Sequence, residues 1–128
     1  MRCLVDTHSL IWWWLGDPKL SAPARTAMTS ADNQIFVSPV SAVEVAIKVR
    51  RGQLSELAEP LENFDRDIVT DGFAHLPITY IHARRAGLLE GKHRDPFDRL
   101  LAAQGLIENL TVITRDSEIA AFGCRTLW

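Results

Sequence analysis

The sequence predicts an α/β protein with three layers, in which helices cover both sides of a central, mostly parallel sheet. Short apolar runs with the pattern of buried strands alternate along the chain with longer segments of helical pattern. This alternation is typical of parallel sheets, because the crossover between two parallel strands is usually a helix. The chain has 128 residues, without internal repeats or low-complexity linkers. We therefore expect a single domain over residues 1–128.

The first half of the chain is expected to contribute two strands and several helices. In chain order these are a strand at 2–6, helices at 7–16 and 21–31, a strand at 34–38, a helix at 39–52 and a mixed helical stretch at 54–72. Gly16 is suited to end the first helix, and Ser21 is suited to cap the second. The third helix has Pro39 in its first turn, where a missing N–H costs nothing, and Gly52 beyond its basic end.

The second half is expected to complete the sheet. Its elements are a strand at 73–78, helices at 79–91 and 95–109, a strand at 110–114 and a short edge strand at 124–128. Two aspartates stand at the start of the last helix. With Asp95 as N-cap and Pro96 as the first helical residue, the Asp95 carboxylate accepts hydrogen bonds from the following backbone N–H groups. The alternative role for Asp98, the second half of a capping box, prefers the longer Glu or Gln. We therefore assign structure to Asp95 and chemistry to Asp98.

Composition excludes several classes of protein. No apolar run approaches the roughly 18 residues that a membrane-spanning helix needs, and the N-terminus lacks the pattern of a signal peptide. We therefore expect a cytoplasmic protein without membrane contact, in which Cys3 and Cys124 are reduced.

The charge pattern limits how the protein could contact nucleic acid. A net charge of −2 gives no overall basic field, so phosphate contacts would have to come from local clusters. The candidate residues for substrate binding are Lys48, Arg50, Arg51, Lys92, Arg94 and Arg115, although basic residues at these places are also typical of solvated helix ends.

Four acidic residues stand where apolar neighbours normally exclude charge. Asp6 ends the first strand, Asp116 follows the strand at 110–114, and Glu44 lies inside an apolar helix. Asp98 shares a helix face with Gly105, whose small size lets that face press closely on the sheet. Each has a structural alternative, because Asp6 and Asp116 can cap the helices that follow them and Glu44 can pair with a lysine one turn on.

Together, the four acids predict a metal site. Asp6 and Asp116 follow strands, and active sites of parallel sheets lie beyond the carboxyl ends of the strands. Converging carboxylates repel one another unless a cation compensates them. All-oxygen ligands suit Mg²⁺ or Mn²⁺, which assist hydrolysis of phosphodiester bonds. The four histidines, His8, His75, His82 and His93, show no ligand spacing.

The segments "LVDTHSLIWW", "VSPVSAVEVAIK", "HRDPFDRLLAAQ" and "LTVITRD" together resemble PIN-domain ribonucleases of the VapC toxin type, in order and over nearly the whole chain. The resemblance implies a PIN-like fold and a Mg²⁺- or Mn²⁺-dependent endoribonuclease. It also implies a homodimer that acts on RNA and is inhibited by a cognate antitoxin, as in type II toxin–antitoxin pairs. The family's four acids correspond to Asp6, Glu44, Asp98 and Asp116. Thr114 matches a supporting hydroxyl position, whereas Asp95 belongs to the DPFDR signature and does not align with a metal ligand.

Two other classes of protein remain as alternatives. A receiver-like signalling domain also has aspartates above a parallel sheet, but it needs paired acids after the first strand and a lysine after a late strand. Here the first strand ends in Asp6-Thr7-His8, and Arg115 stands after the late strand. A catalytically inactive PIN-fold binding domain is the other alternative, and the presence of all four acids argues against it.

The run Trp12 to Trp14 gives a further expectation. Successive helical residues point about 100° apart, so three tryptophans in a row cannot all face one core. We expect at least one ring to serve as an interface anchor. The alternative is that two rings are core and the third covers a neighbouring helix.

Overall fold

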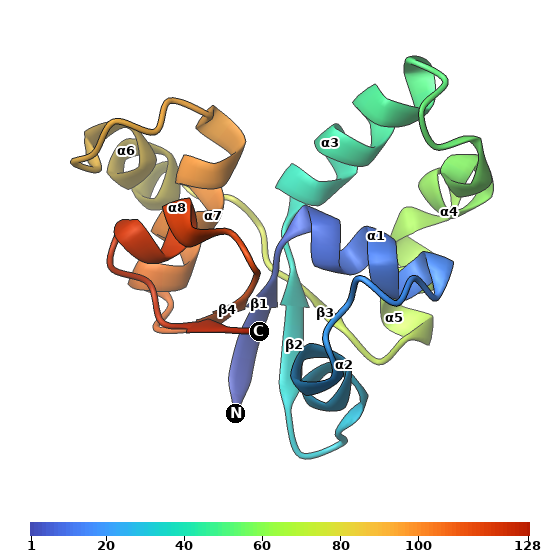
Figure 1. Ribbon diagram of the computed structural model, residues 1–128. Coiled ribbons are helices and arrows are strands. Elements are labelled where there is room, and N and C mark those ends of the chain that lie inside the picture. The colour runs from blue at the N-terminus through green and yellow to red at the C-terminus, as the bar shows by residue number, and fades with distance from the viewer.

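A five-stranded sheet forms the central layer of the structure, a computed structural model that describes residues 1–128 (Figure 1). The elements, in chain order, are β1 Arg2–Val5, α1 Thr7–Leu15, α2 Ala22–Thr29, β2 Gln34–Val37, α3 Pro39–Arg50, the 3₁₀ turn η1 Ser55–Leu57, α4 Ala58–Glu62, α5 Phe64–Thr70, β3 Ala74–His75, α6 Tyr80–Leu88, α7 Pro96–Ile107, β4 Thr111–Ile113, α8 Ser117–Ala121 and β5 Thr126–Leu127. None of these helices is both long enough and apolar enough to cross a membrane.

All neighbouring strands of the sheet are parallel, in the order β3-β2-β1-β4-β5. Val5 at the end of β1 lies opposite Val37 of β2 on one side and Ile113 of β4 on the other. The carboxyl ends of the three central strands therefore meet at one edge of the sheet. The prediction of a three-layer α/β protein with a mostly parallel sheet is confirmed, and no antiparallel pair is present.

The two faces of the sheet are covered by different helices because strand side chains alternate between faces. Cys3 and Val5 of β1 pack in the larger core with residues of α1, α2 and α5, whereas Leu4 packs on the other face with Leu101 of α7. Helix α6 lies outside and packs against α7. Figure 1 shows the resulting division, with α6, α7 and α8 on one side of the sheet and α1 to α5 on the other.

Most elements are shorter at their ends than expected, and two of them end three residues early. The strand expected at 73–78 is reduced to Ala74–His75, because Pro77 has no N–H with which to continue the ladder beyond Leu76. The helix expected at 79–91 ends at Leu88. Residues 89–95 therefore form the connection to α7. This connection brings residues that precede Asp98 in the sequence close to the candidate site.

The three tryptophans of α1 all have partners within the chain. Trp12 is buried and its ring packs edge-on against Trp128. The indole N–H groups of Trp13 and Trp14 both donate to one oxygen of Asp71, at 3.1 and 2.9 Å. This arrangement agrees with the alternative in which the rings serve the core and cover a neighbouring helix. A role in a protein interface remains a prediction.

Candidate active site

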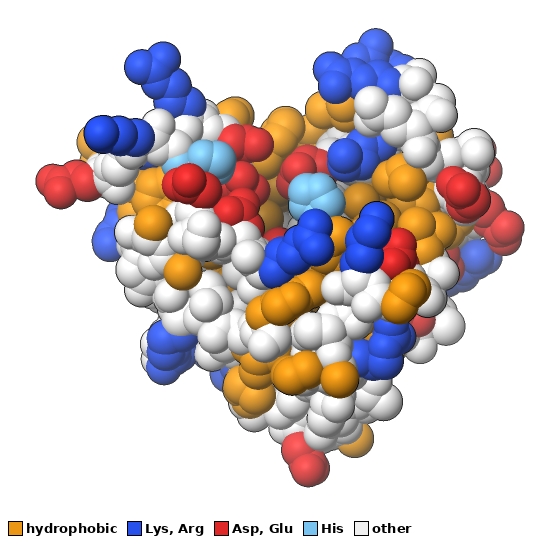
Figure 2. All heavy atoms as spheres, viewed as in Figure 1, with side chains coloured by type: hydrophobic (Ala, Val, Ile, Leu, Met, Phe, Trp, Pro, Cys, Tyr) orange, Lys and Arg blue, Asp and Glu red, His pale blue; other side chains and the backbone are white.

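The candidate site lies at the carboxyl edge of the sheet, between the two groups of helices. Asp6 follows β1 directly, and Asp116 lies in the connection between β4 and α8. Figure 2 shows acidic side chains and histidines on the walls of a notch between two lobes. From its position relative to Figure 1, one lobe contains α3 and the other contains α7 and α8.

Asp6 and Asp116 each cap a helix and still keep one oxygen free. Oδ1 of Asp6 accepts a hydrogen bond from the N–H of Ser9 at 2.8 Å, and Oδ1 of Asp116 accepts from the N–H of Glu118 at 2.9 Å. Oδ2 of each carboxylate has no hydrogen-bond partner in the protein. Both residues line one open hollow of about 330 Å³. The capping role expected as an alternative is therefore present, and it leaves a ligand atom on each acid.

Glu44 is held by a hydroxyl from another element. Oε1 of Glu44 accepts a hydrogen bond from Oγ1 of Thr7 at 2.6 Å, and Thr7 Oγ1 lies 3.0 Å from Oγ of Ser41. Because Thr7 donates its single proton to the carboxylate, Ser41 must donate to Thr7. The expected alternative of an ion pair between Glu44 and Lys48 is not formed. Oε2 of Glu44 remains free.

Asp95 and Asp98 make different contacts at the start of α7. Oδ1 of Asp95 accepts hydrogen bonds from the N–H groups of Phe97 and Asp98, at 2.9 and 3.4 Å. The Asp98 carboxylate does not return to the Asp95 backbone, so no capping box forms. Instead Asp98 Oδ2 lies 2.7 Å from Nε2 of His93, and Oδ1 has no partner. Asp95 is a helix cap beside the site.

Thr114 supports the site through the backbone. Its side chain is buried, and Oγ1 accepts a hydrogen bond from the N–H of Asp116 at 2.9 Å. This bond fixes the turn between β4 and α8 that presents the Asp116 carboxylate. The contact agrees with the supporting hydroxyl that the sequence resemblance implies.

His93 is the residue that the sequence interpretation missed. The histidines show no ligand spacing in the sequence, yet the structure places His93 beside two of the predicted acids. His93, Asp98 and Asp116 each offer one donor atom, and these three atoms lie within 4.8 Å of one another. They are close enough to share a cation. The only sequence signal is its place five residues before Asp98, where spacing alone does not indicate contact.

Glu44 lies outside this tightest group but is coupled to Asp98 electrostatically, and Asp6 acts on Glu44 in turn. Burial raises the pKa of Glu44 above its ordinary value, and the nearby charges of Asp98, Asp95 and Asp6 raise it further, against the lowering effect of the Thr7 hydrogen bond. Burial also raises the pKa of Asp98, with additions from Asp95 and Asp116 and an opposing effect from His93. Burial is the larger cause of both raised pKa values, and repulsion between neighbouring carboxylates adds to it.

The free carboxylate oxygens fit a hard divalent cation. Each of the four acids uses one oxygen for a hydrogen bond within the protein and keeps the other available. Mg²⁺ and Mn²⁺ prefer oxygen ligands, and a cation would relieve the repulsion that adds to the effect of burial on the pKa values of Glu44 and Asp98. The donor set therefore suits the metals that the sequence predicts.

Most of the predicted basic residues lie around the acids. Arg115 lines the hollow shared by Asp6 and Asp116, and its guanidinium stacks over the Trp12 ring at 4.6 Å from the ring centre. Lys48 and Arg51 line a hollow with Glu44, and Lys92 and Arg94 line another with His93. Arg50 is exposed at the end of α3 and lines none of these hollows.

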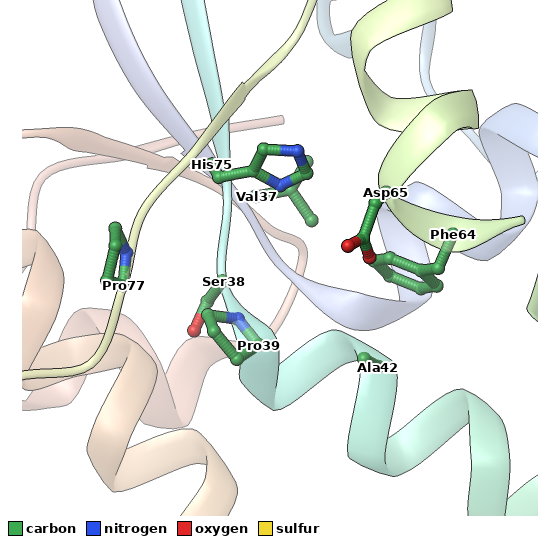
Figure 3. Close-up of a pocket in the computed structure, with 8 residues that line it drawn as sticks. All are labelled: Val37, Ser38, Pro39, Ala42, Phe64, Asp65, His75 and Pro77. Carbon is green, nitrogen blue, oxygen red and sulfur yellow. The ribbon is translucent and has the colours of Figure 1, made fainter.

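A separate hollow beyond β2 and β3 contains none of the predicted acids. Its volume is about 260 Å³, and Figure 3 shows His75 and Asp65 on its walls, above Pro39 and Ala42 of α3. The four acids of the candidate site are absent from its lining. We therefore place the candidate site in the notch of Figure 2.

The titrating groups of the site give a prediction about the metal-free protein. The hydrogen bond to Asp98 raises the pKa of His93 above 6.5, so all three shifted groups, Glu44, His93 and Asp98, have raised values in the fold. A group with a raised pKa binds its proton more tightly in the folded state. Its contribution to stability is complete below the unfolded-state pKa and is lost as the pH rises through the folded-state pKa.

In EDTA, the melting temperature should therefore rise as the pH falls from about 8 to about 5, before general acid unfolding begins. The pH range of this change in stability begins at the raised pKa of His93 and extends down through the raised pKa values of Glu44 and Asp98. Thermal unfolding across this range measures it, with Asp98→Asn as the control that should flatten the profile. Saturating Mg²⁺ should oppose the effect, since metal binding requires deprotonated ligands. A metal-free melting temperature that is highest at the alkaline end would contradict the prediction.

Together, the fold and the site define an α/β protein with a carboxylate site at the edge of a parallel sheet. The PIN domain family matches residues 3–123. The chain therefore belongs to the PIN-domain family, and the predicted PIN-like fold is confirmed.

Solved structures with the same fold cover almost the whole chain. VapBC2 from Rickettsia felis, bound to a DNA fragment from its promoter, superposes with a TM-score of 0.73 at 15% identity, covering 99% of this chain and 98% of that chain. FitAcB from Neisseria gonorrhoeae gives 0.70 at 23% identity, with coverage of 98% and 96%. VapBC-1 from nontypeable Haemophilus influenzae gives 0.68 at 18% identity, with coverage of 99% and 97%. No curated protein matches the sequence at a significant level.

Proposed function

We propose that this chain is a Mg²⁺- or Mn²⁺-dependent endoribonuclease, the toxin of a type II toxin–antitoxin pair. The observation that carries the proposal is the arrangement of Asp6, Glu44, Asp98 and Asp116 around one notch, each with a free carboxylate oxygen. Such a set fits divalent ions for hydrolysis of a phosphodiester bond. Membership in the PIN-domain family supports the proposal.

The toxin part of the proposal rests on two likenesses. The sequence resembles VapC-type toxins, and two structures with the same fold carry the name VapBC. On this basis we propose a cognate antitoxin as partner, a homodimeric toxin and action on RNA in the cytoplasm. Membership in the PIN-domain family removes the receiver-like alternative. The catalytically inactive PIN-fold domain remains the alternative to be separated by experiment.

In the proposed reaction, Asp6, Glu44, Asp98 and Asp116 would hold the cation. The ion supplies positive charge beside the phosphate and makes water a better nucleophile. The chain's own part is to fix the ligands, since Thr7 holds Glu44 and Thr114 holds the backbone of Asp116. The basic residues around the notch are suited to the flanking phosphates of an RNA strand.

The test is cleavage of total RNA and of short single-stranded RNA by the purified chain. We expect cutting with Mg²⁺ or Mn²⁺ and none with EDTA, and restoration when the metal is returned in excess. Addition of the protein encoded by the adjacent gene should suppress cutting. RNA that remains intact with both metals, while the protein still binds that partner, would favour the inactive binding domain.

A further inference from the structure

The loop before α7 is held in place by the side chain of Arg99. Its Nε donates to the carbonyl of Ala86 at 2.9 Å, Nη1 donates to the carbonyl of His93 at 2.9 Å, and Nη2 donates to the carbonyl of Leu89. The guanidinium also lies over the Phe122 ring of the β4–β5 connection, 5.3 Å from its centre. No carboxylate is paired with Arg99. The hydrogen bonds of this arginine therefore tie the end of α6 and the loop before α7 to the start of α7.

The residue that this loop presents to the site is His93. One of the three Arg99 hydrogen bonds ends on the carbonyl of His93 itself. Its ring lies near that of Phe122, with centres 6.2 Å apart, and Nε2 faces the acids at 2.7 Å from Asp98 Oδ2. The His93 side chain is 25% exposed. An imidazole nitrogen is therefore fixed at the rim of the carboxylate site by contacts that come from α7 and the β4–β5 connection.

The distances suit a shared ion. Ligand atoms around an octahedral ion with bonds of about 2.1 Å lie about 3 Å apart when adjacent and about 4.2 Å apart when opposite. The donor atoms of His93, Asp98 and Asp116 all lie within 4.8 Å of one another. Small side-chain rotations would therefore bring all three onto one ion, with the ion replacing the proton between His93 and Asp98.

A nitrogen ligand changes which metal the site prefers. Carboxylates and water suit Mg²⁺ and Mn²⁺ alike, whereas imidazole is used by transition metals and seldom by Mg²⁺. We propose that His93 is a nitrogen ligand of the metal site, positioned by Arg99, and that it favours Mn²⁺ over Mg²⁺ in the proposed nuclease. The proposal rests on the metal site of the proposed function and adds a ligand to its four acids.

The test measures metal binding directly, without cleavage. Mn²⁺ is added to the purified protein, and pulsed EPR is used to look for hyperfine coupling to a bound imidazole nitrogen. We expect this coupling in the wild type and its loss in His93→Gln with Mn²⁺ still bound. Calorimetry should show Mn²⁺ affinity reduced by about tenfold or more, with a smaller change for Mg²⁺. His8→Gln is the matched control, since His8 lines the adjoining hollow with Asp6 and Asp116 and should keep the coupling.

Arg99→Lys tests the positioning role. Lysine keeps the charge but cannot direct donors to three carbonyls at once, so the nitrogen coupling should weaken although His93 is present. Normal coupling in Arg99→Lys would overturn the role of Arg99. Wild-type protein that binds Mn²⁺ without nitrogen coupling would overturn the ligand role, leaving His93 as a partner of Asp98 only in the metal-free protein. Wild-type protein that binds neither metal would instead contradict the proposed function.

Discussion

Asp98→Asn is expected to reduce metal-dependent RNA cleavage by about a hundredfold or more, because the loss of one charged ligand weakens the stabilisation that the metal provides. The fold should remain intact. Burial and the charges of Asp95 and Asp116 raise the pKa of Asp98 in the metal-free protein, so its ionised form costs stability. In EDTA the variant should therefore melt at a slightly higher temperature than the wild type. In saturating Mg²⁺ the order should reverse, and melting curves with and without the metal measure both effects.

Asp95→Ala is the matched control, three residues earlier in the same helix. Asp95 accepts hydrogen bonds from two backbone N–H groups as the N-cap of α7. Its loss should cost about 1 kcal/mol of stability and lower the melting temperature with and without metal, while measurable cleavage remains. An inactive but fully stable Asp95→Ala, beside an active Asp98→Asn, would reverse the roles assigned to the two aspartates.

Gly105→Ala is expected to destabilise the protein, although alanine is normally the better helix former. A Cβ atom at Gly105 would lie 2.9 Å from Cγ2 of Val112, a fully buried residue of β4. Valine is stiff at χ1, so the contact has to be relieved by moving α7 away from the sheet. Overpacking of this kind costs about 1–3 kcal/mol. Because α7 carries Asp98 and β4 leads to Asp116, the shift should also reduce cleavage.

Gly87→Ala separates this packing effect from helix propensity. Gly87 lies in α6, and a Cβ atom there would meet nothing within 4 Å. The substitution should be neutral or stabilising by up to about 1 kcal/mol, with cleavage unchanged. Urea unfolding of the two variants gives the difference in stability. Equal stability would show that the close approach of α7 to β4 at Gly105 is not needed.

The sequence by itself predicted the fold class and the start of α7. Strand runs and helical segments alternate strongly enough to indicate a parallel sheet, and the structure has no antiparallel strand pair. Asp95 followed by Pro96 is a local signal for a helix start, and the observed hydrogen bonds agree with it. These predictions succeed because caps, helix breakers and apolar periods depend on residues close together in the chain.

The four acids were predicted from the sequence, but their hydrogen-bond partners were decided by the tertiary structure. The sequence offered Lys48, one turn away, as a partner for Glu44, yet Glu44 is bound by Thr7, a residue 37 positions distant in the chain. His93 lies beside Asp98, and Arg99 holds the chain before it by hydrogen bonds to backbone carbonyls of α6 and of the loop before α7. Hydrogen-bond partners of this kind depend on how α1 packs on α3 and α6 on α7. Spacing along the sequence indicates only which residues share a helical turn or one face of a helix or strand. It therefore does not determine contacts between different elements.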